Sequence, residues 1–112
     1  MQGDAIKRLV SSEGKSRTYE MQDGTVVRRA GGSASWRNNN PGNLKFEFAG
    51  SADRTVRNPR TREEALGAAQ GRFEGVVALD QWGNAVFKSY EAGRAAKIQL
   101  LERQYPEMTI EQ

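Results

Sequence analysis

The sequence predicts a small α+β domain with an N-terminal helix, two β-hairpins and a C-terminal helix. Two hairpin signals and two helix-like stretches, one near each end of the chain, carry this prediction. The clearer hairpin signal is Asp23-Gly24, which separates two short segments rich in β-forming residues. With 112 residues, the chain has the length of one domain with one modest core.

The first element is expected to be a helix over roughly residues 5–13, capped by Asp4. Its apolar residues lie three and four positions apart, as on one face of a helix. Glu13 continues the same stripe one turn later, and Gly14 then ends the helix. The apolar residues of this stripe are Ile6, Leu9 and Val10.

The remaining elements are expected in a simple order along the chain. They are strands at 17–21 and 25–29, a linker at 30–35, a half-buried strand at 44–48, an arginine-rich loop at 50–62, a short helix at 63–70, a hairpin at 76–87, and a helix after Ser89 to about Gln104. Pro106 ends that helix, and residues 109–112 look like a new helix start. We therefore expect residues 1–112 to be a single domain and a fragment of a longer chain, with a C-terminal portion missing.

The amino-acid composition excludes several kinds of catalytic and metal-binding site. The chain has no cysteine and no histidine, which excludes disulfides, thiol or Ser-His-Asp catalysis and Cys/His zinc sites. Acid–base chemistry would therefore use Asp, Glu, Lys or Tyr, and no cofactor or metal is expected. The net charge of +3 favours an anionic partner such as nucleic acid, a membrane surface or a cell-wall polymer. No stretch has the length of a membrane span, and the N-terminal residues lack the apolar core of a signal peptide.

The stretch Trp36-Arg-Asn-Asn-Asn-Pro-Gly-Asn-Leu44 is the most distinctive motif. Pro41-Gly42 is typical of the centre of a type II turn. Each asparagine amide offers donors and an acceptor, as needed to hold sugar hydroxyls or peptide groups. The alternative is a structural turn whose asparagines bond only to neighbouring backbone. The candidate substrate-binding residues of this stretch are Trp36, Arg37, Asn38, Asn39, Asn40 and Asn43.

The N-terminal layout resembles the opening of phage-type lysozymes (muramidases). In these enzymes a helix ends in Glu-Gly and leads into a hairpin with a second carboxylate, as Glu13-Gly14 does before Asp23-Gly24. The resemblance implies that Glu13 is the catalytic acid and that Glu20 or Asp23 is the second carboxylate. It also implies that Thr25 is the neighbouring hydroxyl, a further candidate substrate-binding residue. Glycoside hydrolysis needs one protonated and one ionised carboxyl group, and a glutamate on an apolar helix face suits the acid role. The alternative is that all three are ordinary helix-end and hairpin residues.

This chain departs from the lysozyme pattern after Thr25, where the family continues with Thr-x-Gly-x-Gly-His and this sequence has Val-Val-Arg-Arg-Ala-Gly-Gly. A second resemblance covers most of the chain. Its motifs are Asp23-Gly-Thr25, Gly31-Gly-Ser33, the asparagine stretch, Gly83-Asn-Ala-Val-Phe87 and Ser89-Tyr-Glu-Ala-Gly93. This series is similar to one in bacterial and prophage-encoded proteins, including virion proteins, cell-wall hydrolases and secreted toxin modules.

Together the resemblances imply a peptidoglycan-targeting glycoside hydrolase of a phage or an antibacterial secreted effector. It would be made in the bacterial cytoplasm and act on cell-wall glycan after lysis or specialised secretion, or in a phage particle, with an immunity or delivery protein as a further partner. A non-enzymatic virion or secretion-apparatus module is the first alternative. A nucleic-acid binder that uses the arginines of residues 54–62 is the second and less favoured one, because a solvated loop is the simpler interpretation.

Overall fold

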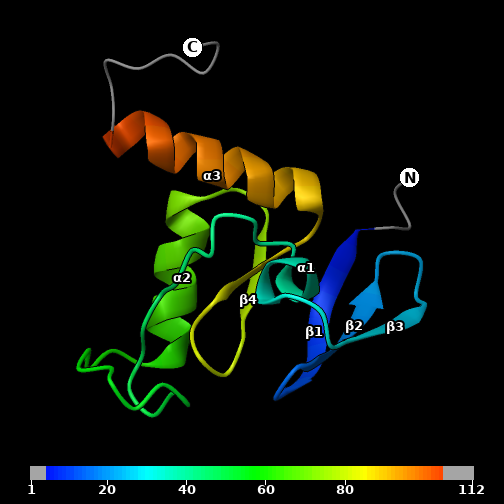
Figure 1. The fold of residues 1–112 in the computed structure, drawn as a ribbon, viewed down its shortest axis with the longest axis horizontal. Helices are drawn as coiled ribbons and strands as arrows, with labels where there is room; N and C mark the ends of the chain where they lie inside the picture. The colour runs from blue at the N-terminus through cyan, green and yellow to red at the C-terminus, as the bar shows by residue number, and fades with distance from the viewer. Residues whose placement is uncertain (1–4, 105–112) are drawn as a thin grey trace.

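The computed structural model describes residues 5–104 and contains a three-stranded antiparallel sheet, a separate two-stranded hairpin and three helices (Figure 1). Strands β1, β2 and β3 form the sheet in that order, and β4 pairs with β5. The α+β class, both hairpins and the C-terminal helix are confirmed. Asp4, Pro106 and residues 109–112 lie outside the described residues. The elements are β1 Ile6–Glu13, β2 Ser16–Met21, β3 Val26–Ala30, α1 Ala34–Asn38, α2 Arg62–Arg72, β4 Val76–Leu79, β5 Ala85–Phe87 and α3 Tyr90–Gln104.

The predicted N-terminal helix is wrong, because residues 6–13 form strand β1. Gly14 has a φ of +50° and sits in the tight turn that joins β1 to β2, so it belongs to a hairpin instead of a helix end. Two register shifts interrupt the pairing with β2. The least exposed positions of β1 are consequently Ile6, Leu9 and Ser12, three residues apart. This spacing imitates the period of a helix.

The short helix α1 begins at Ala34, inside the segment predicted as a linker, and extends into the asparagine stretch as far as Asn38. The Ser33 side chain caps it by accepting a hydrogen bond from the Trp36 N–H at 3.1 Å. Asn39 ends the helix in the left-handed conformation, with a φ of 53°. The turn that follows carries its positive φ at Asn43 and not at Gly42, so the predicted type II turn is wrong.

The short helix predicted at 63–70 is confirmed as α2 with slightly wider bounds, whereas the segment predicted as a strand at 44–48 does not form one. Leu44, Phe46 and Phe48 are buried while Lys45 between them is exposed, although this segment has only one bridge, from Lys45 to Asn84. Helix α2 begins with a capping box at Thr61, and the Ser89 hydroxyl accepts the hydrogen bond that caps α3.

Two apolar clusters form the core. The larger lies between α2, α3 and the hairpin, and the smaller lies under the three-stranded sheet. The buried members of the smaller cluster are Ile6, Tyr19, Met21 and Val86. None of the helices within residues 5–104 has the length and apolar character to cross a membrane.

Candidate functional site

The asparagine stretch lies inside the domain. The three asparagines at 38–40 have at most 5% of their surface exposed. Asn39 donates its amide hydrogen to the Phe87 carbonyl at 3.1 Å. Asn40 donates to the Leu44 carbonyl and accepts from the Leu44 N–H, both at 3.0 Å. Because these bonds satisfy the chain's own backbone, the two side chains join α1 to β5 and the 40–44 turn instead of facing a ligand.

Asn38 belongs to a buried polar cluster with Arg17 and Asp80, here called the polar hub. The side chains of Arg17 and Asp80 are fully buried and form an ion pair at 2.9 Å. Arg17 also donates to the Asn38 Oδ1 at 3.0 Å, and the Asn38 amide donates to Asp80 at 2.9 Å. The hub therefore joins β2, α1 and the end of β4. The Asn38 amide, which was expected to bind a glycan, is engaged in the hydrogen bonds of the hub.

Arg37 is buried as well, and its guanidinium donates to the backbone carbonyls of Gly31 and Gly32. Its own carbonyl accepts the Tyr19 hydroxyl at 2.5 Å. Burial is the main cause that raises the pKa of Tyr19 to about 12. Arg37 thus closes the 31–37 loop onto the sheet and has no surface for a substrate.

The remaining predicted binding residues are at the surface and apart. Trp36 is 48% exposed, and the Arg29 guanidinium lies 5.7 Å from its ring centre. Asn43 and Thr25 are exposed. Thr25 donates to the Asp23 carboxylate from both its hydroxyl and its N–H. Of this group, only Trp36 presents an aromatic surface to solvent.

The three predicted catalytic carboxylates do not form a pair. Glu13 is exposed at the end of β1, opposite Ser16, and Glu20 lies four residues further along β2. At a rise of about 3.3 Å per residue, four residues span about 13 Å along a strand. Glycosidase carboxylates are about 5 to 9.5 Å apart. Glu20 is also bound to Arg8 at 2.5 Å, and the hydrogen bonds from Thr25 hold the pKa of Asp23 below its ordinary value.

Glu13 and the asparagine stretch lie on opposite faces of the sheet. Glu13 pairs with Ser16, so their side chains share one face. Arg17, the next residue, points to the other face, where it binds Asn38. The structure therefore does not bring Glu13 into one cleft with residues 38–40.

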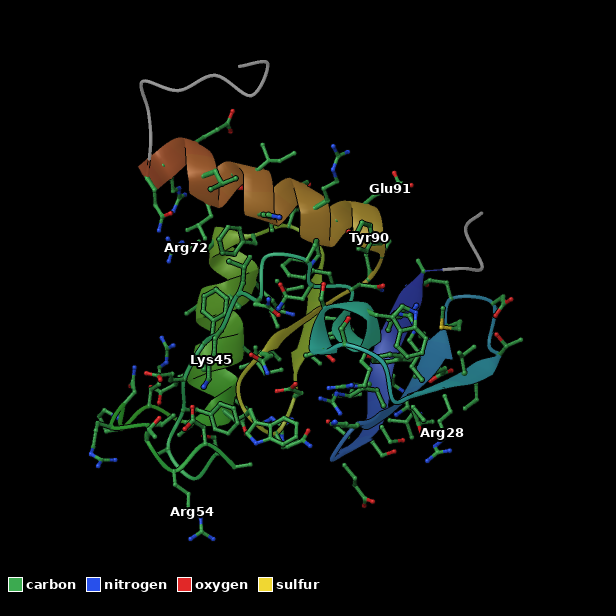
Figure 2. All side chains as sticks on the ribbon, in the orientation of Figure 1. Arg28, Lys45, Arg54, Arg72, Tyr90 and Glu91 are labelled. Atoms are coloured by element: carbon green, nitrogen blue, oxygen red, sulfur yellow. The ribbon has the colours of Figure 1, made fainter. Side chains whose placement is uncertain are left out.

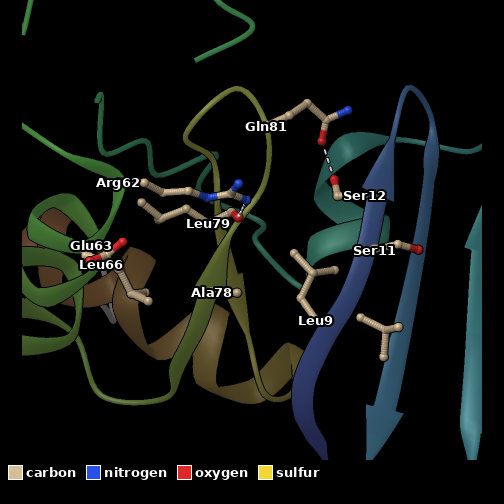
Figure 3. A pocket seen from close by; sticks show the side chains of 10 residues that line it. Leu9, Ser11, Ser12, Arg62, Glu63, Leu66, Ala78, Leu79 and Gln81 are labelled. Atoms are coloured by element: carbon tan, nitrogen blue, oxygen red, sulfur yellow. Dashed lines mark hydrogen bonds between the residues drawn. The ribbon is translucent and has the colours of Figure 1, made fainter. Parts of the chain in front are cut away.

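A groove of about 380 Å³ lies between β1, the start of α2 and β4 (Figure 3). None of the predicted catalytic or binding residues lines it. The Arg62 guanidinium crosses the groove to the Leu79 carbonyl, and Ser12 binds Gln81 at its upper end. Its walls combine apolar side chains with a polar rim, and the main apolar ones are Leu9, Leu66, Ala78 and Leu79.

The arginines of residues 54–62 do not gather into one cationic patch. Arg54 and Arg57 are exposed, and Figure 2 shows Arg54 pointing outward from its loop. Arg60 donates to the Glu47 carbonyl at 2.6 Å and Arg62 to the Leu79 carbonyl at 2.5 Å. Two of these four arginines, Arg60 and Arg62, therefore stabilise the fold through hydrogen bonds to the backbone.

Within residues 5–104, no group of three or more Asp or Glu side chains could hold a metal ion. Comparison with protein-family models, with curated proteins and with solved structures gave no match to this chain. The geometry of the chain itself must therefore decide between the possible functions.

One surface that the sequence analysis missed is the outer strand β3. Sequence reasoning treated this strand only as the second half of a hairpin. The signal was present, however, because Val26-Val27-Arg28-Arg29 breaks the apolar–polar alternation of a half-buried strand. Both valines are exposed in the folded domain.

Proposed function

We propose that this domain is a non-enzymatic binding or structural module of a phage particle or a bacterial secretion apparatus. The observation that carries the proposal is the direction of the asparagine side chains at 38–40, whose amides bind the domain's own interior. The asparagine stretch therefore stabilises the fold of the domain and does not present its amides to a ligand. The phage or secretion setting rests on the motif series that resembles virion and secreted proteins.

The separation of the carboxylates supports the same proposal. A hydrolase needs an acid and a second carboxylate across one sugar–sugar bond. Here Glu13 is exposed on a strand, and Glu20 is bound to Arg8. The lysozyme-like interpretation depended on a helix that would partly desolvate Glu13, and β1 does not do so. Without that burial, Glu13 lacks the environment that suits a general acid.

The test is digestion of purified bacterial cell walls, followed by turbidity and by mass analysis of released fragments. We expect the wild-type domain and Glu13→Gln to release no glycan fragments above buffer, while a purified lysozyme clears the same walls. Release by the wild type that Glu13→Gln abolishes would establish the hydrolase and end this proposal. Co-sedimentation of the domain with the undigested walls reports separately whether cell-wall glycan is a binding partner.

A further inference from the structure

The three-stranded sheet ends at β3, whose outer edge lies at one side of the molecule (Figure 1). Backbone hydrogen bonds at both ends of the β2–β3 pair, from Met21 to Thr25 and from Gly31 to Lys15, are each 2.8 Å long. In an antiparallel pair such bonds recur at every second residue. Val27 therefore directs its backbone N–H and C=O toward β2. The backbone groups that point away from the sheet are those of Val26, Arg28 and Ala30.

These outward backbone groups are available for pairing. In the part of the chain that the structure describes, they make no backbone hydrogen bond outside the sheet. The side chain of Arg28 donates to the Ser16 hydroxyl on β2 at 3.0 Å, so it lies over the sheet instead of covering the edge. The edge thus offers a row of free donors and acceptors, which is what an added strand needs.

The side chains along this edge are apolar to an unusual degree for a surface. Val26 is 66% exposed, Val27 is 38% exposed and Trp36 is 48% exposed. They are three of the six large apolar residues exposed in the described part of the chain. Arg29 connects them, since it shares a strand face with Val27 and lies over the Trp36 ring. An added strand would cover apolar surface on both faces of the sheet edge.

The positive charge along the β3 edge favours an acidic partner. Residues 26–36 contain two arginines, Arg28 and Arg29, and no acidic residue. Neither arginine forms a salt bridge with a described carboxylate. A second copy of β3, paired antiparallel about its centre, would place Arg28 opposite Arg28, and like charges directly opposite each other are destabilising. A strand with acidic side chains on the face of Arg28 would instead neutralise that arginine.

We propose that β3 binds an extended acidic segment of a partner protein by strand addition. The inference deepens the proposed function, on which it rests, because it gives the module the chemistry of its partner. The added strand would form main-chain hydrogen bonds with Val26, Arg28 and Ala30. Its carboxylates would face Arg28, and its apolar side chains would lie beside Val27 and Trp36.

The probe is a synthetic peptide, acetyl-Glu-Val-Glu-Val-Glu-Val-Glu-amide, with a matched peptide in which lysine replaces every glutamate. We expect the domain to bind the acidic peptide at least about tenfold more tightly than the basic one in calorimetric titrations. Arg28→Glu is expected to weaken the acidic peptide about tenfold and to strengthen the basic one, because the sign of the facing charge is reversed. Arg54→Glu makes the same charge change on a distant loop and should leave both affinities close to wild type.

Amide hydrogen exchange distinguishes strand addition from simple charge attraction. Saturation with the acidic peptide should slow exchange at Val26, Arg28 and Ala30, while Val27, already bonded to β2, changes little. No binding up to about millimolar peptide, or binding that leaves the three outward amides unchanged, would overturn the proposal. This readout is independent of wall digestion, so a failure here and a failure of the proposed function are distinguishable.

Discussion

Asp80→Asn is the sharpest test of the polar hub. The substitution keeps the shape of the side chain and removes its charge. Asp80 Oδ1 accepts the backbone N–H groups of Trp82 and Asn84, both at 2.9 Å. The opposite oxygen accepts from Arg17 and Asn38, also at 2.9 Å. If the asparagine oxygen keeps the two backbone bonds, its NH₂ group must face the donors of Arg17, Asn38 and Asn84.

The expected loss follows from the burial of the pair. The side chains of Arg17 and Asp80 have 0% of their surface exposed, so water cannot replace the missing acceptor. Removing one partner of a buried ion pair destabilises a protein by about 3–5 kcal/mol, because the other charge stays buried without compensation. Small domains have a total stability of only about 5–15 kcal/mol. We therefore expect Asp80→Asn to lose a large part of the free energy of unfolding.

The assay is equilibrium urea unfolding followed by tryptophan fluorescence, with Arg17→Met and the double variant completing a cycle. We expect the double variant to be less destabilised than the sum of the single variants by at least about 1 kcal/mol, because it leaves no uncompensated charge. Asp53→Asn is the control, since Asp53 is paired with Lys45 at the surface and its loss should shift the urea midpoint much less. A loss below about 1 kcal/mol for Asp80→Asn, or strict additivity of the cycle, would refute this account of the hub.

Three further predictions concern packing, titration and capping. Gly93→Ala would place its Cβ 1.9 Å from the Asn39 carbonyl oxygen, so we expect a lower melting temperature, whereas the control Gly67→Ala, with no atom within 4 Å, should raise it. Stability should fall as the pH rises from 10 toward 12, because the pKa of Tyr19 is about 12 in the folded domain and 10.0 is its ordinary value. Over the same pH range, the urea midpoint of Tyr19→Phe should fall less than that of the wild type. Thr61→Ala removes the cap of α2 and should cost about 0.5–2 kcal/mol in urea unfolding, with Thr61→Ser close to wild type. Equal effects of the two glycine variants, equal pH slopes, or a neutral Thr61→Ala would contradict the respective prediction.

Local turn chemistry predicted most of the fold. Asp23-Gly24, the capping residue Ser89 and the alternation of Leu44 with Phe46 act over a few residues, and the structure follows each of them. The first element was mispredicted because two irregularities in β1 leave buried positions three residues apart, a spacing that a helix also produces. The pairing of β1 with β2 decides between a helix and a strand. Counting the spacing of apolar residues within 6–13 alone does not reveal that pairing.

The candidate site was less predictable because the partners of its side chains are distant in sequence. The amide of Asn38 binds Asp80, 42 residues away, and that of Asn39 binds the Phe87 carbonyl, 48 residues away. An amide that binds a ligand and one that binds a distant backbone group look the same in a sequence. The exposed edge of β3 could have been found earlier, since two adjacent valines cannot both face the core from one strand.

The hub explains how a chain of this composition holds two small apolar clusters together. Arg17 lies on β2, on the same face as the buried Tyr19 and Met21 that follow it, and Asp80 follows β4, whose Leu79 belongs to the larger cluster. The ion pair between them therefore connects the sheet to the hairpin through a polar contact, beside the apolar contact that Val86 of β5 makes with the sheet in the smaller cluster. The asparagine stretch takes part in this connection, so the recognition proposed above falls to surfaces that the fold leaves free. The outer edge of β3 is such a surface, because exposed apolar, basic and unpaired backbone groups lie together on it.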